Sequence, residues 1–347
     1  MKHFIFILSV LLGFADVFTG CSNSKQQNTF SGPAEGTAIL ITGAAARIPQ
    51  EAALLENLYH KKELNNVVFI AGASSGALNA VMLNGILSHK ITWAQYSGWL
   101  NQITNDSIFQ QKTDKLPVDT SPLKKYITRI VNDSLGFYKM KDLPVTTAIS
   151  ITELNMIDIP KKNYRLCSRK INSESDPELD IVDVLMASTA FPVVFPEQKI
   201  NNAPTLPPKY FADGGMGKDH VPYMGLIDFM RYSKKRVQKV IIVSRKADLE
   251  PDVNQELKEV GVHDFRIFNK IGVSLDEILL KGFISGLKEY KEALPELAKK
   301  TFVYVPNFKE KFLLLDFNDL EKQYSLTKKW AKKNNLVPLE KYLNKYN

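Results

Sequence analysis

The feature that most constrains this chain is a serine between glycines, placed between a run of strand-forming residues and a long apolar segment. Gly72-Ala73-Ser74-Ser75-Gly76 follows residues 67–70, four β-formers in a row, and precedes residues 77–87, an apolar segment of helical length. A G-x-S-x-G pattern between a strand and a helix is typical of a nucleophile elbow, which presents the serine at a helix N-terminus. We therefore expect Ser74 to be a nucleophile, with Gly72 and Gly76 letting the turn close. The alternative is a turn of small residues that packs a helix on a sheet.

Apolar strand-like runs and helical segments alternate along the rest of the chain. Strands are predicted at 37–42, 67–70, 145–152, 163–167, 209–212, 239–244 and 302–305, and helices at 50–60, 77–87, 91–103, 122–134, 180–188, 275–294 and 319–333. This alternation predicts an α/β fold with a mostly parallel sheet. We expect residues 37–225 to form the catalytic core, and residues 226–347 to complete the same domain as a mostly helical cover.

The N-terminus has the features of an export signal. A short basic start precedes an apolar stretch at residues 4–12 that is too short to span a bilayer as a stable helix. Phe18-Thr19-Gly20-Cys21 then resembles the lipobox of bacterial lipoproteins, which predicts a signal peptide at 1–20, lipidation of Cys21 and a polar tether at 21–36. A plain secretory signal or a short uncleaved anchor is the alternative. On the first interpretation the protein is anchored to a membrane of the bacterial cell envelope.

The composition is that of an ordinary globular protein with a basic surplus. Lys and Arg number 45 against 37 Asp and Glu, so the formal net charge is +8. No basic motif interleaved with aromatic residues and no zinc-ligand spacing is present, so we expect no nucleic-acid partner. A solvated basic face or attraction to an anionic membrane explains the surplus. The composition predicts no particular oligomeric state.

A serine nucleophile needs a base, and no histidine is an obvious candidate. The five histidines are His3, His60, His89, His220 and His263, and His220 alone lies close to another motif. That motif is Asp213-Gly214-Gly215, after the short apolar strand predicted at 209–212. A carboxylate at a strand end can accept a serine proton directly, and partial desolvation raises its pKa towards the working pH. By itself Asp-Gly-Gly is also an ordinary turn.

Three segments occur in an order that makes a resemblance specific. They are G-x-S-x-G at 72–76, A-S-x-A-x-P-x-x-F-P at 187–196 and D-G-G at 213–215. In this the chain resembles the patatin-like phospholipase family. The resemblance implies a three-layer α/β/α patatin-like fold, hydrolysis of lipid acyl esters, and a Ser-Asp dyad that requires no histidine, metal or cofactor. Carried over, Ser74 is the nucleophile and Asp213 the base, supported by the turn at Gly214 and Gly215.

The predicted oxyanion hole departs from the family pattern. Members have a G-G-G-x-R-G loop after the first strand, and the matching residues here are Gly43-Ala44-Ala45-Ala46-Arg47, followed by Ile48. Backbone N–H groups form such a hole, and alanine supplies them too, although alanine is strained where φ must be positive. A poorly placed donor slows the reaction by roughly 100- to 1000-fold. His220, in the sequence after the D-G-G turn, is either solvent-facing or an aid to the carboxylate.

These observations predict an acyl hydrolase of phospholipase A or esterase type, acting on membrane lipid or another acyl ester in lipid metabolism. Two alternatives stay open. The first is a catalytically weak, lipid- or acyl-binding lipoprotein of the same fold, suggested by the alanines of the oxyanion loop. The second is an ordinary α/β-hydrolase esterase with a triad that uses His220 or His263.

Overall fold

The computed structural model describes residues 33–112, 116–154, 160–200, 210–249, 258–262 and 274–346. These residues all belong to one compact unit. The predicted signal peptide, Cys21 and most of the predicted tether lie outside the described residues.

The described residues contain a nine-stranded mixed sheet in the order β5-β6-β3-β2-β1-β7-β8-β9, with β4 also paired to β3. The strands are β1 (Glu35–Ile41), β2 (Val67–Ala73), β3 (Thr146–Leu154), β4 (Pro160–Cys167), β5 (Gln198–Lys199), β6 (Tyr210–Asp213), β7 (Arg236–Val243), β8 (Thr301–Tyr304) and β9 (Val337–Pro338). Strands β1, β2, β3, β7 and β8 are parallel, whereas each of β4, β5, β6 and β9 pairs antiparallel with a neighbour.

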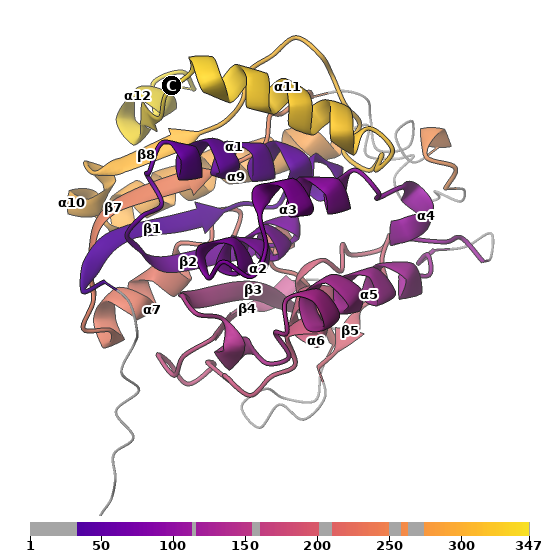
Figure 1. Cartoon of the computed structure of the whole chain (residues 1–347), viewed down its shortest axis with the longest axis horizontal. Coiled ribbons are helices and arrows are strands. Elements are labelled where there is room, and N and C mark those ends of the chain that lie inside the picture. The colour runs from indigo at the N-terminus through magenta and orange to yellow at the C-terminus, as the bar shows by residue number, and fades with distance from the viewer. Residues whose placement is uncertain are drawn as a thin grey trace, which may run out of the picture. The chain divides into compact units, whose positions relative to one another are not determined.

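Helices cover both faces of this sheet (Figure 1). They are α1 (Ile48–His60), α2 (Ser75–Leu87), α3 (Trp93–Leu100), α4 (Asn105–Ile108), α5 (Ser121–Thr128), α6 (Ile181–Ser188), α7 (Met224–Tyr232), α9 (Leu275–Ala293), α10 (Pro295–Ala298), α11 (Leu320–Lys333) and α12 (Leu339–Leu343). Shorter helical turns are η1 (Ala45–Arg47), η2 (Arg129–Ser134), η3 (Met140–Asp142) and η4 (Gly214–Met216). In Figure 1, α1, α3 and α11 lie in front of the sheet, and α7 and α9 lie behind it.

The central strands are apolar on both sides because each side packs against a helical layer. Ile39 and Ile70 belong to the core cluster that includes residues of α1 and α2. On the opposite face Phe69 stacks on Phe229 of α7, with 4.8 Å between the ring centroids. Strands buried on both faces carry no apolar–polar alternation, which is why they stand out in the sequence as short continuous apolar runs.

The layers confirm the predicted α/β fold with a mostly parallel central sheet. The segment after residue 225 contributes strands as well as helices, since β7 pairs with β1 and β8 pairs with β7. Residues on both sides of that boundary therefore build the same sheet.

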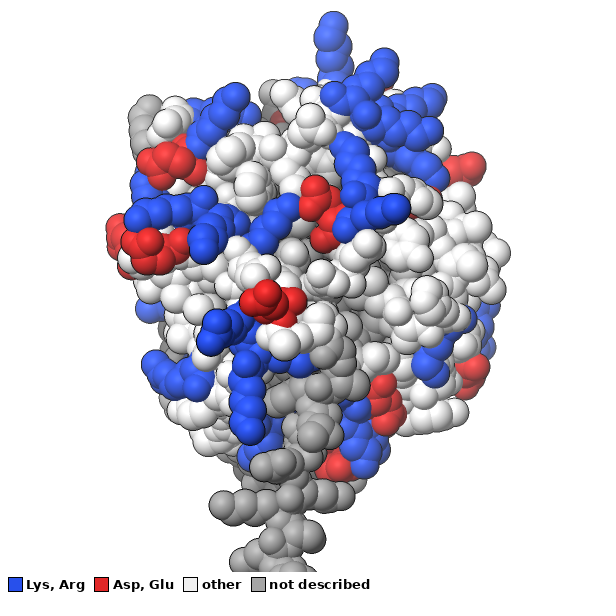
Figure 2. All heavy atoms as spheres, turned by 60° about the vertical axis from the view of Figure 1, so that its left-hand side comes forward, with Lys and Arg blue, Asp and Glu red and all other residues white. Residues whose placement is uncertain are grey.

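Charged side chains of both signs are spread over the surface. Figure 2 shows a face on which Lys and Arg predominate, with Asp and Glu between them. Several of these charges are paired, such as Lys291 with Glu340 and Lys299 with Glu296, each at 2.6 Å. Exposed pairs of this kind contribute about 0–1 kcal/mol each, so they affect solubility and surface potential more than the fold.

Candidate active site

Ser74 lies on the turn between β2 and α2 and has a backbone conformation that is rare for a side-chain-bearing residue. Its φ is 56° and its ψ is −133°. The turn is tight: a Cβ atom on Gly76 would be 2.1 Å from the Thr42 carbonyl oxygen, and one on Gly72 would be 2.4 Å from the Gly76 carbonyl oxygen. Neither position can hold a larger residue without moving backbone. The predicted elbow geometry is therefore present, with a strained Ser74 directly before the first residue of α2.

Strand register explains how Asp213 reaches Ser74. Parallel β2 pairs with β3 up to the partners Ala73 and Ser150. From the next residue on, β3 pairs with antiparallel β6, through Ile151 and Asp213. The other edge of β3 is occupied by β4 over this whole stretch. Strands β2 and β6 thus share one edge of β3, and their carboxyl ends meet head-on.

The side chains at these two strand ends are in contact. The Asp213 carboxylate accepts a 2.8 Å hydrogen bond from the Gly215 N–H, and the Ser74 side chain is near enough to favour its ionised form. Burial raises the pKa of Asp213 from 3.8 to about 6, and Ser74 and the Gly215 N–H only partly oppose the rise. Asp213 is therefore mostly ionised at neutral pH and more basic than an exposed aspartate.

The 187–196 motif fixes both strand ends. Ser188 Oγ accepts a hydrogen bond from the Ser74 N–H at 3.0 Å and donates one to the Ser150 carbonyl at 2.8 Å. Two residues later, the Ala190 carbonyl accepts a hydrogen bond from the Asp213 N–H at 2.9 Å. The sequence identified this motif only through resemblance, whereas its contacts explain it physically: the motif holds the backbones of Ser74 and Asp213 in one register.

Three residues that the sequence did not indicate support the turn after Asp213, namely Asn163, Ser150 and Asp219. Asn163 of β4 donates a hydrogen bond to the Gly214 carbonyl at 3.1 Å. Buried Asp219 accepts one from Ser150 Oγ at 2.9 Å. Gly214 itself is needed for close approach, because a Cβ atom there would be 2.4 Å from the Ser150 carbonyl oxygen. Nothing in the local sequence around Asn163 or Ser150 signals these roles, since they depend on the β3–β4 pairing.

The five predicted oxyanion-loop residues do not all offer a free donor, which corrects the prediction. The Ala44 N–H donates to Ser75 Oγ, the Ala46 N–H to the Leu314 carbonyl and the Arg47 N–H to the Ala44 carbonyl, each at 2.8 Å. Among the described residues, the N–H groups of Gly43 and Ala45 have no such partner. The remaining candidate donors of the oxyanion hole are therefore the N–H groups of Gly43 and Ala45.

Geometry favours Gly43 as the donor closer to the nucleophile. A Cβ atom on Gly43 would lie 3.1 Å from Ser74 Cβ and 3.7 Å from Ser74 Oγ. Ala45 has a φ of 44°, in the left-handed region where alanine is strained. The sequence-based expectation that alanine would be strained in this loop therefore applies at Ala45.

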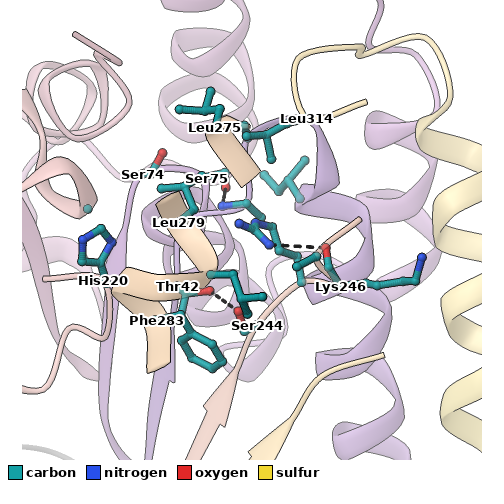
Figure 3. A pocket seen from close by; sticks show the side chains of 18 of the residues that line it. Thr42, Ser74, Ser75, His220, Ser244, Lys246, Leu275, Leu279, Phe283 and Leu314 are labelled. Atoms are coloured by element: carbon teal, nitrogen blue, oxygen red, sulfur yellow. Dashed lines mark hydrogen bonds between the residues drawn. The ribbon is translucent and has the colours of Figure 1, made fainter. Parts of the chain in front are cut away.

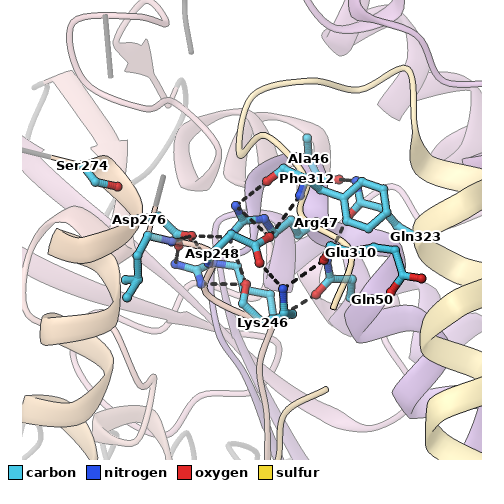
Figure 4. A network of polar contacts seen from close by, with 12 residues as sticks. Ala46, Arg47, Gln50, Lys246, Asp248, Ser274, Asp276, Glu310, Phe312 and Gln323 are labelled. Carbon is cyan, nitrogen blue, oxygen red and sulfur yellow. Dashed lines mark hydrogen bonds and ion pairs between the residues drawn. The ribbon is translucent and has the colours of Figure 1, made fainter. Parts of the chain in front are cut away.

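Arg47 has a structural role that its place in the loop did not reveal. Its guanidinium is fully buried and forms a 2.6 Å ion pair with Asp276, a 3.5 Å ion pair with Asp248 and a 2.6 Å hydrogen bond to the Phe312 carbonyl (Figure 4). These partners belong to segments some 200 or more residues further along the chain. Arg47 therefore joins the oxyanion loop to the C-terminal half, where both of its terminal guanidinium nitrogens are hydrogen-bonded.

A cavity of about 420 Å³ opens at the dyad. Ser74, Asp213 and the loop from Thr42 to Ala45 line it at one end. Most of the remaining wall is apolar and comes from several helices and loops, with Leu78, Ile103, Leu123, Phe191, Phe195, Leu275, Leu279, Phe283, Leu314 and Phe317 among its residues. Figure 3 shows Leu275, Leu279 and Phe283 of α9 on one side of this space. The volume and lining suit a flexible apolar chain next to one reactive, polar end.

No described histidine is placed as a base. His60 and His89 are exposed on the surface. His220 lines the cavity, but its ring packs against α9, where a Cβ atom on Gly282 would be 2.4 Å from Nε2. Burial lowers the pKa of His220, and within the described part of the chain no hydrogen bond joins it to Ser74 or Asp213. His3 and His263 lie outside the described residues.

The described residues also bear on metal binding and on membrane insertion. No group of three or more His, Cys, Asp or Glu side chains is arranged to hold a metal ion. Within the same ranges, every helix is too short or too polar to cross a bilayer.

The family model for patatin-like phospholipases matches residues 38–227, more than half of the chain. The chain belongs to the patatin-like phospholipase family. The matched region contains the elbow, the 187–196 motif and the D-G-G turn, so the family assignment and the contacts described above concern the same residues.

Solved structures of other proteins are remotely similar to this chain. VipD from Legionella pneumophila matches at 13% identity and a TM-score of 0.32, over 87% of this chain and 67% of VipD. The type III effector ExoU matches at 12% identity and a TM-score of 0.34, over 90% of this chain and 53% of ExoU. ExoU in complex with SpcU, from Pseudomonas aeruginosa, gives 13% identity and a TM-score of 0.36, over 87% of this chain and 52% of that one. This chain thus spans about half to two thirds of those proteins. No curated protein sequence matches it.

Proposed function

We propose that this patatin-like protein hydrolyses acyl esters of lipids through a Ser74–Asp213 dyad. The Ser74 hydroxyl attacks the ester carbonyl carbon while its proton passes to Asp213. The N–H groups of Gly43 and Ala45 then donate to the oxyanion. When the ester C–O bond breaks, the leaving alcohol takes the proton from Asp213. Water next attacks the acyl-enzyme, gives a proton to Asp213 and releases the fatty acid, and Ser74 recovers its proton.

The observation that carries this proposal is the head-on meeting of β2 and β6 on one edge of β3. It brings a strained serine to a buried carboxylate with a raised pKa, and no histidine of the described residues is hydrogen-bonded to either group. A base whose pKa is about 6 is ionised at neutral pH and still basic enough to take a proton. The apolar cavity supports a lipid acyl chain as substrate, and family membership supports phospholipase A or esterase chemistry.

A location follows from the same proposal. We place the enzyme on a membrane of the bacterial cell envelope, held by a lipid on Cys21, with membrane lipid or another acyl ester as its substrate. Support comes from the lipobox-like sequence at 18–21 and the polar sequence after it. Metabolic labelling with a palmitate analogue tests the anchor: label should be lost in a Cys21→Ser variant and kept in a Cys167→Ser variant, in which the other cysteine is replaced.

Mass spectrometry of lipid products tests the reaction and its substrate class together. Purified wild-type protein incubated with phospholipid vesicles should release free fatty acid and lysophospholipid. Ser74→Ala and Asp213→Asn proteins should release at least about 1000-fold less, because each lacks one half of the dyad. Matched controls are Ser285→Ala and Asp106→Asn, which alter an exposed serine and an exposed aspartate. Equal product release from wild type and Ser74→Ala protein would refute the mechanism.

One observation favours a second candidate, a catalytically weak protein that binds lipid or acyl groups. Three of the five loop N–H groups are used within the protein, and Ala45 is strained. On this alternative a fluorophosphonate probe leaves Ser74 unlabelled, while fatty acid or lysolipid still binds in the cavity. Stoichiometric labelling of Ser74 excludes it.

A further inference from the structure

A buried acid that the dyad does not use lies directly behind the oxyanion loop. Glu51 of α1 is 0% exposed. Its Oε1 lies 3.1 Å from Thr42 Oγ1, and its Oε2 accepts a 3.1 Å hydrogen bond from Asn79 Nδ2. Asn79, on α2, also donates to the Ile48 carbonyl at 3.3 Å and accepts from the Tyr96 hydroxyl at 2.6 Å. Glu51 is thus held by the residue after β1, by α2 and, through Asn79, by α3.

Thr42 connects this acid to the active site. It is the residue before Gly43, whose N–H is a candidate oxyanion donor. Its hydroxyl lies 2.7 Å from Ser244 Oγ, and both residues line the cavity (Figure 3). A continuous row of oxygen atoms therefore runs from Glu51 through Thr42 to Ser244 at the cavity wall.

The surroundings of Glu51 favour its protonated, uncharged form. Burial raises its pKa to about 8, and the hydrogen bonds from Thr42 and Asn79 and the charge of Arg245 only partly oppose this. Arg245 is already paired with Asp276 at 2.9 Å. Tyr96 also faces this site through Asn79, and its pKa is raised well above its ordinary value, so it stays uncharged. With its proton, Glu51 can donate to Thr42, and Thr42 can donate to Ser244.

We propose that Glu51 is a positioning residue of the hydrolase, which rests on the function proposed above. As an uncharged acid it holds Thr42, and through Thr42 the turn that aims the Gly43 N–H at the oxyanion. When Glu51 loses its proton, the Thr42 hydroxyl turns from Ser244 to the carboxylate. A buried negative charge then stands behind a site where negative charge must develop, and it opposes the transition state.

The pH profile of kcat tests this role. In wild-type protein kcat should rise as Asp213 ionises and fall as Glu51 ionises, so that at about pH 9.5 it is about 30-fold below its maximum. Glu51→Gln cannot ionise and should lack the fall while keeping the rise. Glu56→Gln is the matched control: Glu56 is also a buried acid of α1, hydrogen-bonded to Tyr324 at 2.9 Å, and its variant should keep the fall. Ser74→Ala protein measures the background at each pH.

A second pair of variants covers the case in which Glu51→Gln does not fold. Thr42→Val removes the hydroxyl that joins the acid to the loop, and kcat should drop about tenfold with KM within twofold, because a positioning effect acts on the transition state. Thr42→Ser should restore most of that loss. A purely structural role for Thr42 would instead change the unfolding midpoint without this kcat effect.

The outcomes separate the two proposals. If no Ser74-dependent hydrolysis occurs at any pH, the proposed function fails. If Ser74-dependent hydrolysis occurs but Glu51→Gln keeps the wild-type alkaline fall, or Thr42→Val leaves kcat unchanged, the role of Glu51 is refuted and the hydrolase stands.

Discussion

Asparagine in place of Asp213 should inactivate the protein and stabilise it at the same time. The catalytic loss follows because an amide cannot accept the Ser74 proton. The gain in stability follows because the wild-type fold holds an ionised carboxylate in a buried place. The amide side chain of the Asp213→Asn variant would keep an oxygen for the Gly215 N–H, which donates to Asp213 at 2.8 Å, without the desolvated charge.

The size of the expected gain in stability comes from the pKa of Asp213. Folding raises it from 3.8 to about 6. At about 1.36 kcal/mol for each tenfold change in proton affinity, this difference corresponds to about 3 kcal/mol. The buried carboxylate destabilises the folded state. Below the pKa of the unfolded state, Asp213 is protonated in both the folded and the unfolded protein, and this penalty is zero. It grows as pH rises from 3.8 to about 6 and is constant above that.

Urea unfolding of both proteins across this pH range measures the effect. The Asp213→Asn protein should be more stable than wild type by about 3 kcal/mol at about pH 7.5, and the two should differ little at about pH 3.5. Asp106→Asn, at an exposed aspartate, should show no such pH-dependent gain. A constant difference between Asp213→Asn and wild type at all pH values would refute the reasoning. It would show that packing, and not a buried charge, separates them.

Three further substitutions test other parts of the site. Ser188→Ala leaves the Ser74 N–H unpaired and should lower kcat about tenfold with little change in KM, measured with a short-chain ester. Ala45→Gly relieves the positive φ of 44° and should raise the free energy of unfolding by about 0.5–1 kcal/mol in urea titrations, without loss of activity. His220→Ala should keep kcat within about fivefold of wild type, whereas a drop of about 1000-fold or more would favour a triad over the Ser74–Asp213 dyad.

The parts of this fold that could be predicted are those fixed by local patterns. The buried strands at 37–42, 67–70 and 145–152 were predicted within two residues of β1, β3 and the start of β2, because strands covered on both faces must be apolar throughout. The elbow was predictable because its turn leaves room only for small residues. Helix α7 was not predicted, since its sequence is short and lies between loops that carry no clear boundary signal.

The direction of β6 was not predictable from four residues. A strand that ends in Asp-Gly-Gly suggests a catalytic group at the carboxyl edge of a parallel sheet, yet β6 runs antiparallel to β3. It reaches the same place from the opposite side, because β3 extends past the end of β2 and offers a free edge there. Long-range strand pairing determines the direction of β6. Contacts between distant segments also determine the partners of the Ala44 and Ala46 N–H groups, which are Ser75 and Leu314.

The two buried acids at this site require opposite charge states, and this limits the pH range of the enzyme. On the proposed mechanism Asp213 must be ionised to take a proton, whereas Glu51 must stay protonated to hold Thr42. Burial raises both pKa values, to about 6 for Asp213 and about 8 for Glu51. Both carboxylates have partners that favour the anion, Ser74 and the Gly215 N–H for Asp213, and Thr42, Asn79 and Arg245 for Glu51. The larger rise at Glu51 therefore reflects a greater cost of burial. Activity should therefore be highest between these two values, and Glu51→Gln should extend that range only on its alkaline side.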